Sequence, residues 1–149
     1  TAALHGSTSY GLSGSAANQI AAGKRPLSSM SPSFIDSPEA FATFGTPGGS
    51  RTPSMVLLPM RSHLDRQPPS AWVAIPRYHH HYLPDVLEHE ANTFSPIEQT
   101  QLQQRGHHLK IVERPYGNQQ VLLWNKQSGK VEGASDPRGI GRTLLLQAN

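Results

Sequence analysis

Short apolar stretches, separated by glycine and proline, make up the hydrophobic pattern of this chain. Residues 26–36 (PLSSMSPSFID) alternate weakly between apolar and polar positions, which predicts a strand, although Pro32 restricts part of it to a sheet edge or a kink. Residues 37–44 (SPEAFATF) follow after a turn. The pattern therefore predicts two antiparallel strands joined by a short loop.

A helix is predicted next, from Ser50 as its N-cap to about Asp65. Pro53 is tolerated in the first turn, where backbone amides have no helical partner. Pro59 stands inside the apolar pattern. We expect it to kink or shorten the helix, because proline donates no backbone hydrogen bond.

The C-terminal half combines extended and helical patterns. Residues 71–90 (AWVAIPRYHHHYLPDVLEHE) mix aromatics, prolines and histidines, and we interpret them as an extended segment that crosses one side of the fold. Ser95 and Glu98 form a capping-box pattern, which predicts a helix of about three turns that Gly106 closes. Further strands are predicted at 108–113, 119–124 and 130–136. Together these elements indicate an α+β fold, with helices on one face of an antiparallel sheet.

Composition divides the chain into two parts. Residues 1–23 are rich in Gly, Ala and Ser and predict a linker or a poorly ordered start, whereas 24–149 have the patterns of one domain. For an autonomous domain, 36% hydrophobic and 15% charged residues with 13 Gly and 13 Pro is a loop-rich composition. It indicates either long surface loops or a piece that packs against something else.

Charge and cysteine content remove several classes of function. The 13 basic residues are scattered, so we expect no nucleic-acid partner. With no cysteine, the chain has no disulfide and no thiolate metal site. No apolar run reaches the length of a membrane span, and the first residues do not resemble a signal peptide.

The stretch FGTPGGSRTP at 44–53 is the first candidate for chemistry. Gly48 and Gly49, between a strand and a helix start, let backbone amides converge on an anion, a carboxylate or the oxyanion of acyl transfer. The phosphate-binding patterns GxGxxG and GxxxxGK[ST] are absent. On spacing alone, a tight turn without a ligand is the favoured interpretation.

Three further groups are weaker candidates. Ser28 and Ser29 point to opposite faces if they lie in a strand, and no GxSxG pattern surrounds them. The histidines lack the HExxH spacing of zinc sites, so we interpret them as structural or surface residues; they are His79, His80, His81, His89, His107 and His108. Arg77 and Arg138 suit charge-assisted pairs with carboxylates, and we interpret both as structural.

Taken together and in order, four motifs carry a resemblance to a known family. They are NQIAAGKRPLSSMSP, GTPGGSR, PRYHHHYLPD and GASDPRG, and from about Tyr10 to about Arg138 the chain resembles the small subunit of the gamma-glutamyltranspeptidases. The resemblance implies a piece of an N-terminal nucleophile hydrolase with an αββα sandwich, cut from a precursor that processes itself. It also implies hydrolysis or transfer of the γ-glutamyl group of glutathione and related compounds, no cofactor, and a periplasmic or secreted location.

Residue by residue, the resemblance assigns roles to the motifs. Gly48 and Gly49 match the oxyanion-hole glycines, and Ser28 and Ser29 match the pair that binds the α-carboxylate of the γ-glutamyl group. Arg77 and Arg138 fall on arginines that we assign to structure or maturation rather than to substrate.

Two departures from the family pattern limit the carry-over. The nucleophile motif, a threonine followed by Thr or Ser, His and an aromatic residue, is missing, and TAALHG after Thr1 does not match it. We therefore take Thr1 as a fragment end rather than the nucleophile. The prolines in SRTPSMVLLPM interrupt what the family makes a regular helix, which puts the helix length in doubt.

The leading expectation is the C-terminal part of a gamma-glutamyltranspeptidase small subunit, inactive alone and completed by the remainder of its precursor. One alternative is a related acylase that acts on poly-γ-glutamate or acylated β-lactams. Another is a non-catalytic interaction domain. In each case we expect the isolated chain to expose apolar surface and to self-associate.

Overall fold

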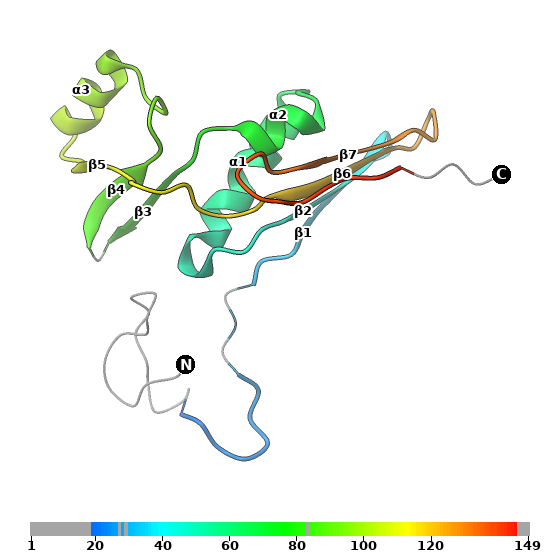
Figure 1. Cartoon of the computed structure of the whole chain (residues 1–149), viewed down its shortest axis with the longest axis horizontal. Helices are drawn as coiled ribbons and strands as arrows, with labels where there is room; N and C mark the ends of the chain where they lie inside the picture. Colours follow the sequence, from blue (N-terminus) through cyan, green and yellow to red (C-terminus); the bar gives the residue numbers. More distant parts are fainter. Residues whose placement is uncertain (1–18, 27, 29, 83, 146–149) are drawn as a thin grey trace.

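A four-stranded antiparallel sheet forms one end of the molecule (Figure 1). The computed structural model describes residues 19–26, 28, 30–82 and 84–145. The sheet has the order β1-β2-β6-β7, with strands β1 (Ser33–Asp36), β2 (Ala40–Gly45), β6 (Gln120–Asn125) and β7 (Val131–Ser135). Sequence-adjacent strands pair as hairpins, and β2 pairs with β6 across the long connection between them.

Local turn chemistry closes the first of the two hairpins of this sheet. The Ser37 Oγ accepts hydrogen bonds from the amides of Glu39 and Ala40 at 3.3 and 3.0 Å, which closes the β1–β2 turn. Both hairpins confirm the strand predictions. The predicted start of the first strand is wrong, because β1 begins at Ser33, directly after Pro32, and the described residues from 26 onward to that point are irregular.

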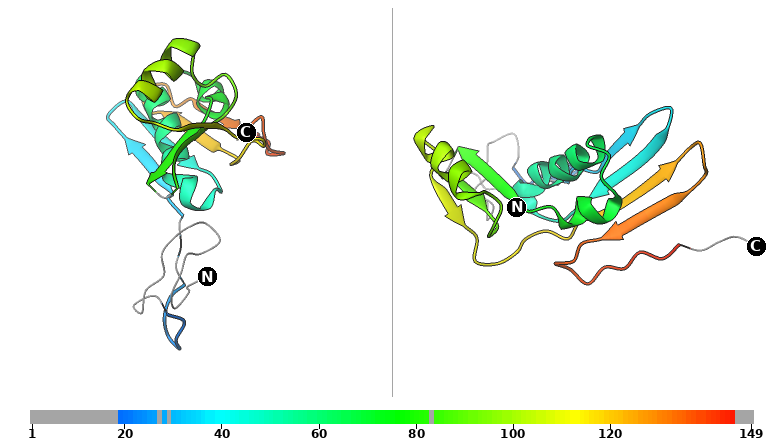
Figure 2. Two further views of the ribbon diagram at one scale, coloured as in Figure 1. Left: turned by 90° about the vertical axis from the view of Figure 1, so that its left-hand side faces the viewer. Right: turned by 90° about the horizontal axis from the view of Figure 1, so that it is seen from above.

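Helices α1 (Thr52–Leu64) and α2 (Pro69–Ala74) cover one face of the four-stranded sheet (Figure 2). The core lies between them and the strands and consists of Ala42, Phe44, Val56, Trp72, Val73 and Val121. The Phe44 and Trp72 rings lie 5.5 Å apart, and the indole Nε1 of Trp72 donates to the Gln67 carbonyl at 2.6 Å. Burial of these aromatic side chains is what attaches the helices to the sheet.

Helix α1 corrects two expectations. Ser50 is not its N-cap, because residues Gly49–Arg51 form a 3₁₀ turn and Arg51 takes the cap position without a side-chain hydrogen bond. Pro59 does not shorten the helix, which runs unbroken to Leu64. The Pro59 ring is fully buried, so packing offsets the backbone hydrogen bond that proline cannot make.

A second sheet of three strands forms the other end of the molecule (Figure 1). Its order is β3-β4-β5, with strands β3 (Tyr78–Tyr82), β4 (Asp85–His89) and β5 (Leu109–Ile111). Strands β3 and β4 are antiparallel, whereas β4 and β5 are parallel and are joined through α3 (Pro96–Gln104). The interpretation of 71–90 as one extended segment is wrong, because α2 occupies its start and a hairpin the rest.

Helix α3 begins and ends as its sequence predicts. The Glu98 amide donates to the Ser95 Oγ at 3.3 Å, and the Ser95 amide donates to the Glu98 carboxylate at 2.7 Å. Gly106 follows the helix with φ +92°, a left-handed conformation that suits glycine. The capping box is therefore confirmed, together with the α+β fold class and its helices on one face of an antiparallel sheet.

The face of the four-stranded sheet opposite α1 and α2 is apolar and open. Strand alternation places Phe34, Leu122, Trp124 and Val131 on this face, and Trp124 is 46% exposed. The rings of Phe34 and Phe41 stack at 5.8 Å. Within the described parts of the chain, every helix is too short or too polar to cross a membrane.

Candidate active site

The glycine turn, residues 46–51, links the end of β2 to the start of α1. Gly49 has φ +57°, in the left-handed region, and Gly48 has φ 163°, which is extended backbone. The carbonyl of Gly48 accepts a hydrogen bond from the Arg51 amide at 3.1 Å, and the carbonyl of Gly49 accepts one from the Thr52 amide. No described residue accepts a hydrogen bond from the Gly48 or Gly49 amide. Both donors thus lie, without a partner among the described residues, at the N-terminal end of a helix, where the potential is positive.

At position 48 a side chain would meet a packing contact, rather than backbone strain. A Cβ added to Gly48 would lie 1.9 Å from the Cε methyl of Met55, one turn into α1. At Gly49 the positive φ is the constraint. A substitution would therefore displace the Met55 methyl group at position 48 and strain the backbone at position 49.

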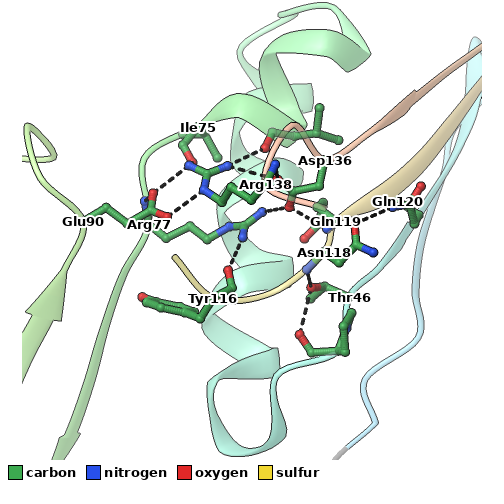
Figure 3. Close-up of polar contacts among 12 residues, drawn as sticks. Thr46, Ile75, Arg77, Glu90, Tyr116, Asn118, Gln119, Gln120, Asp136 and Arg138 are labelled. Atoms are coloured by element: carbon green, nitrogen blue, oxygen red, sulfur yellow. Dashed lines mark hydrogen bonds and ion pairs between the residues drawn. The ribbon is translucent and has the colours of Figure 1, made fainter. Parts of the chain in front are cut away.

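A loop at the same end of the sheet supports the glycine turn. This connection, residues 115–119, precedes β6. The Asn118 amide donates to the Thr46 Oγ1 at 3.0 Å, and the same hydroxyl donates to the Pro47 carbonyl at 3.0 Å. Gly117 has φ +82° beside this contact. The turn and the connection are therefore attached to each other by side-chain and backbone atoms (Figure 3).

Arg77 also contacts the 115–119 connection. Its side chain is 2% exposed, and its guanidinium donates to the Tyr116 carbonyl and pairs with the Asp136 carboxylate (Figure 3). The Gln119 amide donates to the same carboxylate oxygen as Arg77, the Asp136 Oδ2, at 2.7 Å. Burial alone would raise the pKa of Asp136, but the Gln119 amide and the Arg77 guanidinium together lower it.

Arg138 completes the buried network. Its Nε and Nη2 donate to the two carboxylate oxygens of Glu90, each at 2.6 Å. Nη1 donates to the Val73 carbonyl at 3.0 Å, and Nη2 also donates to the Ile75 carbonyl at 3.2 Å. Burial lowers the pKa of Arg138, but the Glu90 and Asp136 carboxylates outweigh it and raise that pKa. The predicted pairing of both arginines with carboxylates is confirmed: Arg77 contacts Asp136 through one nitrogen, and Arg138 contacts Glu90 through two. Their assignment to structure or maturation stays a prediction.

The predicted serine pair is only partly within the described residues. Ser28 is exposed in irregular chain, and its Oγ accepts a hydrogen bond from the Met30 amide at 3.2 Å. Ser29 and Thr1 lie outside the described residues. No contact joins Ser28 to Gly48 or Gly49 in the described structure, so the shared substrate site stays a prediction.

The histidines take several separate roles. His79 is buried, and its Nδ1 lies 2.9 Å from the Ser54 Oγ of α1. Burial, with the nearby charges of His81 and Arg51, lowers the pKa of His79 to about 4. His80 pairs with Asp85 at 2.7 Å on the surface. Among the described residues, no three His, Asp or Glu side chains are arranged to hold a metal ion.

Sequence reasoning missed the acidic members of the network. Arg77 and Asp136 are 59 positions apart, so no local pattern reveals that pair. The contact of Asp136 with Arg138, in contrast, is local, because the two are two positions apart. Arg138 and Glu90 are 48 apart. The local signals were the two arginines inside the PRYHH and DPRG motifs and Asp136, which belongs to the second motif.

Comparison with known proteins gives a consistent result. A family model described as gamma-glutamyltranspeptidase matches residues 2–146. The glutathione hydrolase proenzyme of Escherichia coli (strain K12) is 36% identical over 133 residues, which are 88% of this chain and 22% of that protein. The chain thus spans less than a quarter of the length of this curated relative.

Two solved structures extend the similarity to the fold. The W525D mutant of gamma-glutamyltranspeptidase from Pseudomonas nitroreducens matches with a TM-score of 0.83 at 31% identity, over 99% of this chain and 77% of the other. An acivicin-inhibited gamma-glutamyltranspeptidase matches with a TM-score of 0.79 at 34% identity, over 87% and 70%. The structure of that second protein was described as revealing critical roles for its C-terminus in autoprocessing and catalysis.

Proposed function

Because this chain belongs to the gamma-glutamyltranspeptidase family, we propose that it supplies the oxyanion hole and part of the substrate site of an enzyme that hydrolyses or transfers γ-glutamyl groups. The observation that carries the proposal is the glycine turn. Its two amides stand at a helix start without a partner among the described residues. Glutathione is the substrate we propose, since the curated relative is named a glutathione hydrolase.

The chemistry assigned to Gly48 and Gly49 is stabilisation of developing charge. When a nucleophilic hydroxyl attacks the γ-glutamyl carbonyl carbon, the C=O π electrons move onto oxygen and create an oxyanion. Two amide donors aimed at that oxygen stabilise it more than they stabilise the neutral carbonyl, which lowers the barrier. We place the nucleophile and its base outside these 149 residues, since TAALHG does not match the family's threonine motif.

Ser28 and Ser29 are proposed to bind the α-carboxylate of the γ-glutamyl group. The Ser28 hydroxyl accepts from the Met30 amide, so its own proton is free to be donated to an anion. A hydroxyl whose oxygen accepts a hydrogen bond is a stronger donor, which favours binding of a carboxylate. The buried network of Arg77 and Arg138 acts at a distance from the substrate, by holding the 115–119 connection against the glycine turn.

The direct test is a crystal structure of the longer protein with a γ-glutamyl boronate or phosphonate bound to its nucleophile. We expect one analogue oxygen within about 2.7–3.1 Å of the Gly48 and Gly49 amides. Donors from other residues around that oxygen would overturn the assignment. The 149-residue chain alone should release no p-nitroaniline from γ-glutamyl-p-nitroanilide, and activity that disappears in Thr1→Ala would contradict the placement of the nucleophile.

The partner we propose is the remainder of the precursor, packed on the open sheet face. Phe34, Leu122, Trp124 and Val131 give that face an apolar surface that another layer can cover. In isolation, the chain should self-associate through it. Light scattering should show a concentration-dependent mass that Trp124→Lys abolishes and Leu64→Lys, on exposed α1 surface, leaves unchanged; a monodisperse monomer contradicts the proposal.

A periplasmic or secreted location is also proposed. It rests on family membership alone. Fractionation of the source cells, with antibody against this chain, tests it directly.

A further inference from the structure

One side chain fills the space between the glycine turn and the 115–119 connection. Met55 lies in the first turn of α1 and is 1% exposed. Its Cε methyl occupies the position where a Cβ of Gly48 would stand, at 1.9 Å from it. Its Sδ lies 2.7 Å from the corresponding position at Gly117. Met55 thus fits into the two places that the absent side chains of these glycines leave open.

Side chains other than Met55 surround Gly117 on the 115–119 connection. A Cβ at Gly117 would also lie 2.9 Å from an Nη1 of Arg77 and 3.0 Å from the Oγ1 of Thr46. The buried arginine and the Asn118–Thr46 hydrogen bond therefore hold the connection in place. The size of the side chain at position 55 therefore determines how far the Gly48 backbone lies from that connection.

We propose that Met55 is a positioning residue, which sets the place of the Gly48 and Gly49 amides by filling the gap between Gly48 and Gly117. This inference rests on the proposed function of the glycine turn. The physical reason is that buried side chains pack at crystal-like density, so that removal of the thioether lets backbone on either side move into the space. Shifts well below 1 Å in amide donors change transition-state stabilisation strongly, while substrate binding elsewhere is left intact.

The test compares variants of the longer protein that contains this chain. Met55→Ala should lower kcat about 10- to 100-fold and leave KM within about twofold of the wild-type value. The affinity for a γ-glutamyl boronate inhibitor should fall by a factor similar to that for kcat. Met55→Leu, which conserves volume, should recover kcat to within about threefold. The control is Val56→Ala, the neighbouring buried position that faces the sheet core and makes no contact with the glycines.

A structural role alone gives a different pattern. If Met55→Ala and Val56→Ala lower activity only in proportion to the fraction of folded protein, the inference is overturned. A wild-type kcat in Met55→Ala overturns it as well. If Met55→Ala does not fold, the double variant Gly48→Ala with Met55→Ala refills the gap with a methyl group, and it should be more active than Gly48→Ala alone.

The two proposals fail in different ways. A boronate oxygen on donors other than Gly48 and Gly49 overturns the proposed function itself. A boronate oxygen on those amides, with unchanged kcat and inhibitor affinity in Met55→Ala, overturns only the role of Met55.

Discussion

The two ends of the molecule are stabilised by different means. In the helix-covered layer, which consists of β1, β2, β6, β7, α1 and α2, aromatic and aliphatic side chains form the core. In the three-stranded part, which consists of β3, β4, β5 and α3, the helix buries no side chain and the buried strand residues include two histidines. Burial of apolar side chains therefore accounts for the stability of the helix-covered layer, but not for that of the three-stranded part.

Polar contacts attach the three-stranded part to the helix-covered layer. Four residues beside or within β3 and β4 contact a residue of the helix-covered layer. Three contacts are ion pairs, and they are Arg77 with Asp136, Glu90 with Arg138, and Glu88 with Arg51. The fourth is the hydrogen bond of His79 with Ser54. A core of packed hydrocarbon tolerates many substitutions of similar volume, whereas a buried ion pair does not tolerate loss of one charge. We therefore expect the charged positions that are most sensitive to substitution to lie where the three-stranded part meets the helix-covered layer, next to the glycine turn. We call this set of polar contacts the junction.

The largest effect is expected in the helix-covered layer. Trp72→Ala should lower the free energy of unfolding by about 3 to 5 kcal/mol, because it removes the side chain that packs on Phe44 and His63. Urea denaturation followed by circular dichroism measures the change. The other tryptophan is the matched control: Trp124 is on the open face, and Trp124→Ala should cost about 1 kcal/mol or less. Equal losses would contradict the assignment of the core to one face.

The junction comes next. Asp136→Asn should cost about 3 kcal/mol, since it leaves the buried Arg77 guanidinium without an anion and replaces one of the two oxygens, which accept from the Gln119 and Arg138 amides, with an NH2 donor. Hydrogen exchange should show faster opening of β4 than of β2, because the junction is weakened before the core. Asp65→Asn breaks an exposed pair with Arg61 and serves as control, with an expected change of less than about 1 kcal/mol. Uniformly faster exchange in both strands would contradict the comparison.

Local signals in the sequence were enough for some elements of both regions. The hairpin turn at Ser37 and the capping box at Ser95 depend on residues two or three positions apart, and both were predicted. The start of α1 was misassigned because a 3₁₀ turn, rather than the Ser50 side chain, begins the helix. Helix α2 was missed because prolines on both sides favour an extended interpretation, and burial of Trp72 against distant strands outweighs that tendency.

The candidate site divides in the same way. Glycines 48 and 49 were found because a bare backbone before a helix is a local pattern. Met55, Gly117, the Glu90 partner of Arg138 and the pairing of Asp136 with Arg77 were not found, since these contacts join segments that are distant in the chain. No periodicity or spacing rule encodes such contacts.

Acidification should weaken the junction by a smaller amount. The pKa of His79 is lowered from its usual value near 6.5 to about 4, mainly by burial. Between these values the unfolded chain binds a proton at His79 and the folded chain does not, so stability falls as the pH drops through this range. At pH 5 we expect about 2 kcal/mol less stability than at pH 8.

The measurement is urea denaturation across that pH range, in the parent and in His79→Asn. The variant should show a flatter profile, with a remaining slope of the same sign because burial also lowers the pKa of His63. Identical slopes in the two proteins would show that His79 does not titrate in this way.

The smallest effect is expected in α3, which is the most exposed element of the three-stranded part. Ser95→Ala should cost about 1 kcal/mol, because the Glu98 amide loses the Ser95 Oγ that caps it, while the backbone amide at position 95 can still donate to the Glu98 carboxylate. Since α3 buries no side chain, hydrogen exchange should accelerate in its first turn and remain unchanged in β2 and β6. Gln103→Ala, at an exposed position of the same helix, is the control and should change stability by no more than about 0.5 kcal/mol. A loss of protection in β2 after Ser95→Ala would mean that the two regions unfold as one cooperative unit, which their different means of stabilisation argue against.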